Sequence, residues 1–293
     1  MSGPENLNAP ATLLGKATSN VENLPLTVVG PRAPWQRLEL AELWRYRELL
    51  FFLAWRDVKV RYKQTLLGVA WAILQPTLMM VVFTLVVGRL GPAAENDGVP
   101  YPVFVYSGLL PWTFFATALA NAGQSVVQAE RLITKVYFPR LAVPLAAVGA
   151  ALVDFALASP LLAVLTAFYG GATWSWTVAL LPLWTLAILL AAVGVGTLLA
   201  ALNVAYRDVR HALPFLIQLW LLATPTVYLP QVQTAGWLEI NPLNGLISGF
   251  RAAALGQPVP WPRLAYPTLA VAVALVVGVT YFRRVEDSFA DVI

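Results

Sequence analysis

The residues that could do chemistry are few, and their types favour binding over catalysis. The sequence contains no cysteine and a single histidine, His211. This excludes disulfides, thiol catalysis and cysteine-ligated metals, and one histidine alone cannot form a metal site or a Ser-His triad. Gly15-Lys16 is followed by Ala17, and no glycine precedes this pair by five residues, so the chain lacks a Walker A phosphate-binding loop. We therefore expect no cofactor in this chain and no enzymatic activity.

The acidic residues are not arranged as a catalytic pair. Most of them lie in the N-terminal tail and in loops, where solvated surface charge is the simpler explanation. Asp154 is the exception, because it falls near the middle of a long apolar segment, where burying it costs roughly 2.5–3.5 kcal/mol. A functional role and a hydrogen bond between helices both remain open for Asp154. With no membrane-buried Lys, Arg or His expected beside it, a proton relay is poorly supported.

Aromatic and basic residues form two adjacent stripes on a helix expected over residues 35–66. Aromatic rings suit the boundary between lipid and water, and cations there meet lipid phosphates. We therefore predict an amphipathic helix at the membrane interface; a helix packed on a soluble partner is the alternative. The residues assigned to this membrane interface are Trp44, Trp55, Arg56, Lys59, Arg61 and Lys63.

The composition is that of an all-α integral membrane protein. Hydrophobic residues make up 59% of the chain, charged residues 12%, and the mean hydropathy is +0.69, values far from those of a soluble domain. The net charge of +4 is therefore read as basic loops on one membrane face, and no nucleic-acid partner is expected. Residues 68–88 carry no charge and reach about 31 Å as a helix, the thickness of the hydrocarbon core.

The pattern predicts a flexible cytoplasmic tail at 1–34, a transmembrane domain over residues 67–285 and a cytoplasmic tail at 286–293. A kink is expected at Pro76, an interruption at Pro111, and a tilt or break at Pro144 or Pro160. A short outer segment at 241–256 is too short to span and is expected to be re-entrant. Six transmembrane helices are predicted, at about 68–88, 103–122, 141–169, 177–202, 213–229 and 264–282.

The distribution of Lys and Arg sets the orientation. Nine lie in residues 1–67, three in 124–140, two in 203–211 and two at 283–284, which makes sixteen on one side. The other side has three, Arg89, Arg251 and Arg263. By the positive-inside rule both termini are cytoplasmic, and the number of spans is even.

Four segments resemble, in order, the ABC-2 type permeases of bacterial polysaccharide export, which include O-antigen, capsule and teichoic-acid exporters. They are WRDVKVRYKQTLLGVAWAILQP at 55–76, LITKVYFPRLAVP at 132–144, NVAYRDVRHALPF at 203–215 and NPLNGLISGFR at 241–251. The resemblance as a whole extends over roughly residues 38–285. The resemblance implies a homodimer of six-helix subunits in the bacterial inner membrane, joined to two separate ABC ATPase subunits that bind Mg-ATP.

The resemblance also implies two functional surfaces. One is a helix that couples to the ATPase, with Arg131, Leu132, Ile133, Lys135, Val136, Tyr137 and Phe138. The other is a channel for a lipid-linked polysaccharide, with walls from the first and fifth spans. Aromatic faces stack on sugar rings without fixing their position, which suits a moving polymer, although lipid or core packing is the simpler explanation for any single ring. The assignment of the first and fifth spans as walls selects the channel residues Trp71, Phe83, Phe215, Trp220 and Tyr228.

Three functions are compared on this basis. The leading hypothesis is the permease subunit of an ABC exporter of lipid-linked polysaccharide such as O-antigen. The alternative from the same class is an ABC-2 permease for a drug or another lipid. A membrane-embedded glycosyltransferase needs clustered acidic or metal-binding residues at the membrane face, and the loops offer no such cluster.

Overall fold

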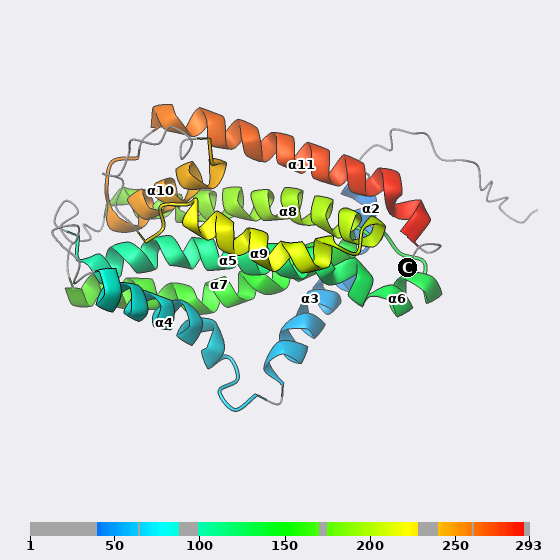
Figure 1. Cartoon of the computed structure of the whole chain (residues 1–293), viewed down its shortest axis with the longest axis horizontal. Coiled ribbons are helices and arrows are strands. Elements are labelled where there is room, and N and C mark those ends of the chain that lie inside the picture. Colours follow the sequence, from blue (N-terminus) through cyan, green and yellow to red (C-terminus); the bar gives the residue numbers. More distant parts are fainter. Residues whose placement is uncertain are drawn as a thin grey trace, which may run out of the picture. The chain divides into compact units, whose positions relative to one another are not determined.

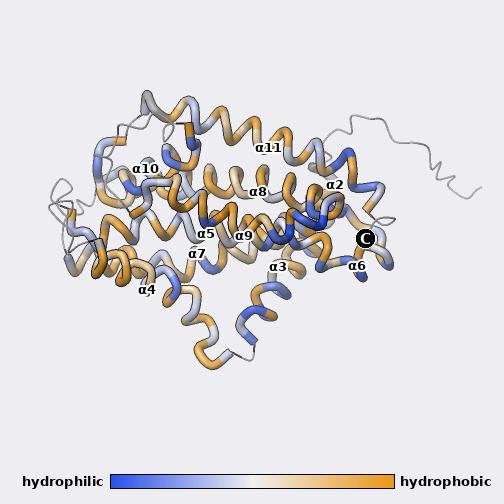
Figure 2. The backbone as a smooth tube through the Cα atoms, in the orientation of Figure 1, coloured by the Kyte–Doolittle hydropathy of each residue, from blue (hydrophilic) through white to orange (hydrophobic). Residues whose placement is uncertain are grey.

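The computed structural model describes residues 40–63, 65–87, 99–169, 175–227, 240–259 and 261–289. Within these ranges the regular elements are helices, and no β-strand is formed. This confirms the all-α class expected from the composition. Figure 2 shows that apolar residues cover most of the helices, while polar ones gather on α3 and at the ends of the bundle.

Four long helices run side by side and form the body of the chain (Figure 1). They are α5 (Tyr101–Gln128), α7 (Ala142–Tyr169), α8 (Leu181–Ala205, preceded by the 3-10 turn η2 at Trp176–Leu180) and α11 (Ala265–Val285). Each is long and apolar enough to cross a membrane, and they match the second, third, fourth and sixth predicted spans. Most of α5 is buried within the chain, whereas the other three bury about a third or less of their apolar length. α5 is thus the core helix, and its neighbours leave broad apolar faces outward.

Two apolar helices are shorter: α4 (Ala70–Val87) and α9 (Val209–Leu222). With 14 residues, α9 is about 21 Å long, less than the bilayer core of about 30 Å. The fifth span was predicted to reach residue 229, but the helix ends at Leu222, and Tyr228 lies outside the described residues. The first and fifth spans are therefore the two whose described helices are shortest.

The prolines do not break the long helices. An interruption was expected at Pro111, yet α5 continues through it, and α7 continues through Pro144 and Pro160. Pro144 falls in the first turn of α7, where the missing N–H has no helical partner to lose. At Pro111 the helix is enclosed by α7 and α8, and packing holds the backbone against the local preference.

Small residues allow α8 and α11 to approach closely. A Cβ placed on Gly278 would lie 1.9 Å from the carbonyl oxygen of Gly194. The two backbones are thus in direct contact where the helices cross, the arrangement that small residues permit between membrane helices.

The interface helix is divided in two. Residues 35–66 were expected to form one helix; the structure has α2 (Leu40–Arg45) and α3 (Arg47–Tyr62), separated at Tyr46. Buried Val58 and Leu53 face the bundle, while Trp44 and Phe51 are exposed. In Figure 1, α3 and α4 run away from the body of the bundle and approach each other below it, so that they form the two arms of a V.

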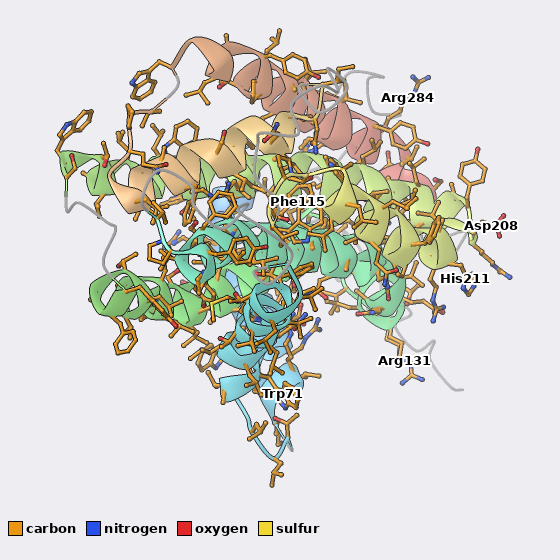
Figure 3. The ribbon with its side chains drawn as sticks, turned by 60° about the vertical axis from the view of Figure 1, so that its left-hand side comes forward. Trp71, Phe115, Arg131, Asp208, His211 and Arg284 are labelled. Carbon is orange, nitrogen blue, oxygen red and sulfur yellow. The ribbon has the colours of Figure 1, made fainter. Side chains whose placement is uncertain are left out.

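Four residues that were predicted to lie on the same side of the membrane are found at one end of the bundle. Figure 3 places Arg131 of α6 (Glu130–Lys135), Asp208 and His211 near the start of α9, and Arg284 of α11 at the same end of the bundle. All four were predicted to be cytoplasmic. The helix α10 (Pro242–Leu255), which lies within the segment predicted to be re-entrant (241–256), is at the opposite end (Figure 1).

Candidate functional site

The segment predicted to couple to an ATPase divides into a buried and an exposed set. Ile133 and Phe138 are 6% and 5% exposed and belong to a hydrophobic cluster that also includes residues of α5, α7, α8 and α11. Tyr137 is 75% exposed. Leu132 is partly exposed, and the remaining members are exposed: Arg131, Lys135 and Val136. The buried side chains of Ile133 and Phe138 thus hold this segment against the bundle, while its charged side chains and Tyr137 are exposed.

The predicted channel aromatics lie in different surroundings. Trp71 and Phe215 are exposed on α4 and α9, and Phe83 is partly buried. Trp220 is also partly buried; its ring meets that of Phe115 edge-on, with the centroids 5.3 Å apart. Tyr228 is outside the described residues. Within one chain, these side chains do not form a single site.

Asn241 joins the end of α9 to the start of α10. Its side-chain oxygen accepts from the indole N–H of Trp220 at 3.1 Å and from the backbone N–H of Leu243 at 3.1 Å. Its amide nitrogen donates to the Ala223 carbonyl and the Thr224 hydroxyl. The Asn-Pro pair at 241–242 is a typical helix start, with Asn as the N-cap and Pro at the first position. That signal was available in the sequence, but the bond to Trp220 was not.

Asp154 is paired with the interface helix. The Arg61 guanidinium donates to the Asp154 carboxylate and forms an ion pair with it, and the Tyr62 hydroxyl donates to the same carboxylate at 2.5 Å. Burial raises the pKa of Tyr62, against a smaller lowering by Arg61, so the hydroxyl is protonated near neutral pH. Arg61 was assigned to the membrane interface, and no Lys, Arg or His was expected within the membrane beside Asp154; the second expectation is corrected, because Arg61 is paired with Asp154. This pair ties α3 to the middle of α7.

Arg251 was counted only as an outer cation, yet it is 6% exposed in the structure. Its Nη2 donates to the Thr226 carbonyl at 2.8 Å, its Nε donates to the Ser107 hydroxyl at 3.3 Å, and its guanidinium carbon lies 3.8 Å from the centroid of the Phe104 ring. It therefore connects α10, α5 and the residues that follow α9. A lone cation within an otherwise apolar, glycine-containing segment was the only sequence signal.

Metal chemistry finds no support in the part of the chain that the structure describes. No group of three His, Asp or Glu side chains there could hold a metal ion. The features described above instead bind helices to one another and present polar and aromatic side chains outward, which suits transport and association.

The family model described as ABC-2 type transporter matches residues 48–255. The chain is 34% identical over 258 residues to the O-antigen export system permease protein RfbA of Myxococcus xanthus, covering 85% of this chain and 97% of that protein. It is 26% identical to the protein of the same name from Klebsiella pneumoniae, over 84% of this chain and 95% of that protein. The Polysialic acid transport protein KpsM of Escherichia coli is 23% identical, over 80% of this chain and 92% of that protein.

Proposed function

Because the chain belongs to the ABC-2 type transporter family, we propose that it is the permease subunit of an ATP-driven exporter of a lipid-linked polysaccharide of the O-antigen kind. The observation that carries this proposal is the similarity to O-antigen export permeases along nearly their whole length. The match to the family model runs from the first turn of α3 to the end of α10 and so includes α6.

The transport domain is proposed to sit in the bacterial inner membrane with both termini in the cytoplasm. The four long helices make four crossings. We infer that α4 and α9, each extended by the residues next to it, make two more, and that α10 dips into the membrane from the outer side. The positions of Arg131, Asp208, His211 and Arg284 at one end support this orientation (Figure 3).

The channel is proposed to lie between two copies of the chain, against α4 and α9. Gln75 and Gln218 support this placement, because both are exposed on these apolar helices in a single chain. Amide side chains are unfavourable toward hydrocarbon and normally face a helix bundle or a water-filled space. The exposed rings of Trp71 and Phe215 flank them along these helices and offer faces for weak sugar stacking.

ATP hydrolysis is assigned to two partner ATPase subunits, which would hold the Mg-ATP. The exposed set around Tyr137 is proposed to enter a groove on the ATPase. We expect Tyr137→Ala to weaken association with the ATPase while the permease remains inserted and stable. Phe138→Ala is the contrast, because removing this buried ring costs about 3–5 kcal/mol and acts through folding. Unchanged ATPase binding in Tyr137→Ala would move the coupling surface elsewhere.

The function is tested by reconstituting the chain with its ATPase subunit in lipid nanodiscs. Lipid-linked glycan extracted from the membranes of the source bacterium is expected to stimulate ATP hydrolysis. Hydrophobic drugs and lipids without a glycan serve as the competing substrates. Stimulation by those compounds and not by the glycan would replace the proposal with drug or lipid export.

A further inference from the structure

A cavity of about 370 Å³ lies between the end of α3, the start of α4 and the middle of α5 and α7. It shares Trp71 and Gln75 with the proposed channel face of α4, while α5 and α7 supply most of its lining residues. Arg61, Tyr62 and Asp154 form one side of it. A cavity of this size is at the small end of the range for ligand pockets, so it fits one or two sugar rings and not a threaded polymer.

The polar part of the cavity wall is nearly neutral in charge. The charge of Arg61 is balanced by Asp154, with which it is paired. Gln75, Thr113 and Thr117 add an amide and two hydroxyls. A balanced pair beside neutral donors and acceptors is poorly suited to phosphate, because the Asp154 carboxylate would repel an anion.

One of these polar groups has no partner. The Asn121 side-chain nitrogen is buried and makes no hydrogen bond in the structure, although Asn121 lines the cavity. A buried donor left unpaired costs about 1–3 kcal/mol. The arrangement indicates that a ligand with acceptor oxygens completes this bond.

Aromatic rings complete the lining. The indole of Trp71 is half exposed and lines the cavity. The rings of Phe114 and Phe155 also line it, and their centroids are 5.3 Å apart. Hydroxyl and amide partners together with aromatic faces are the chemistry that suits a sugar ring, which has hydroxyls at its edge and C–H groups on its faces. A second cavity, of about 480 Å³ and lined mainly by aliphatic side chains of α7 and α8, lacks this combination.

We propose that the cavity between α3, α4, α5 and α7 binds a neutral sugar unit of the exported glycan and so recognises the substrate before it is threaded. This rests on the proposed function, because it takes the glycan as the substrate. Asn121 donates to a sugar oxygen, and Trp71 stacks on the ring. The Arg61–Asp154 pair supplies both a donor and an acceptor at the edge of the ring.

The test measures ATP hydrolysis by the reconstituted complex as a function of the concentration of lipid-linked glycan from the source bacterium. Asn121→Leu is expected to raise the concentration for half-maximal stimulation about tenfold, the loss expected for one hydrogen bond in a closed site, without lowering the melting temperature. Trp71→Ala should raise it similarly, and Trp71→Phe less. Thr166→Val, in the second cavity, is the matched control and should leave it unchanged.

A competition arm identifies the ligand. Methyl glycosides of the neutral sugars that composition analysis finds in the glycan should inhibit the stimulated activity of the native complex, and Asn121→Leu should reduce that inhibition. Inhibition by pyrophosphate alone would identify an anion site and overturn the proposal, as would an unchanged half-maximal concentration in Asn121→Leu. If the glycan stimulates the native complex, the export function stands in either case; if it does not, the export function itself fails.

Discussion

Arg251 should be a stabilising centre of the end of the bundle that contains α10, and Arg251→Met tests this directly. Methionine keeps the length of the side chain and its apolar packing but removes the guanidinium. The bonds to the Thr226 carbonyl and the Ser107 hydroxyl are then lost, together with the contact with the Phe104 ring. The carbonyl of Thr226, a residue with no exposed surface, is left without this donor.

The expected loss follows from these three contacts. A hydrogen bond from a charged donor contributes about 1.5–3 kcal/mol, with the 3.3 Å bond near or below the lower limit, and a desolvated cation over an aromatic ring contributes about 2 kcal/mol. Relief from burying the cation offsets part of this. A net loss of about 3–5 kcal/mol corresponds to a melting temperature lower by about 6–20 °C.

Thermal unfolding of the detergent-solubilised protein, followed by tryptophan fluorescence, measures this change. Arg210→Met is the matched control, because Arg210 is exposed on the first turn of α9, and surface changes usually stay within about 0.5 kcal/mol. Equal melting temperatures for Arg251→Met and the native protein would refute the reasoning. The free-energy cost of desolvating the Arg251 guanidinium would then be equal to the stabilisation that its contacts provide.

Gly278→Ala should lower the melting temperature by the equivalent of at least about 1–3 kcal/mol, because its Cβ would overlap the Gly194 carbonyl and separate α8 from α11; native stability would show that the helices cross less closely. Below the melting transition of either variant, Trp220→Phe should support more glycan export than Trp220→Leu if stacking is the role of this ring. Equal export would assign Trp220 to packing alone. Reporter fusions after Lys135 and Gly256 should give cytoplasmic and periplasmic signals respectively, and a periplasmic signal at Lys135 would contradict the proposed topology.

Local sequence determined the class of the protein and the position of most helices. Apolar runs of membrane length must be helical in lipid, because an isolated segment can satisfy its backbone hydrogen bonds there only within itself. The ranges 103–122, 141–169, 177–202 and 264–282 therefore identify the four long helices without knowledge of their neighbours. The clusters of Lys and Arg are also visible in the sequence, and by the positive-inside rule they predict which end of the bundle faces the cytoplasm.

Lateral contacts between helices were decided only by the tertiary structure. Nothing in a local pattern connects Arg61 with Asp154, 93 residues apart, or places Arg251 over Phe104. The seven coupling residues looked equivalent in the sequence, whereas burial separates Ile133 and Phe138 from Tyr137. Hydropathy reports whether a residue can enter the membrane. Which helix it then faces depends on packing between segments that are distant in the chain. That packing pairs Arg61 of the interface helix with Asp154 in a partly buried ion pair and carries α5 unbroken through Pro111.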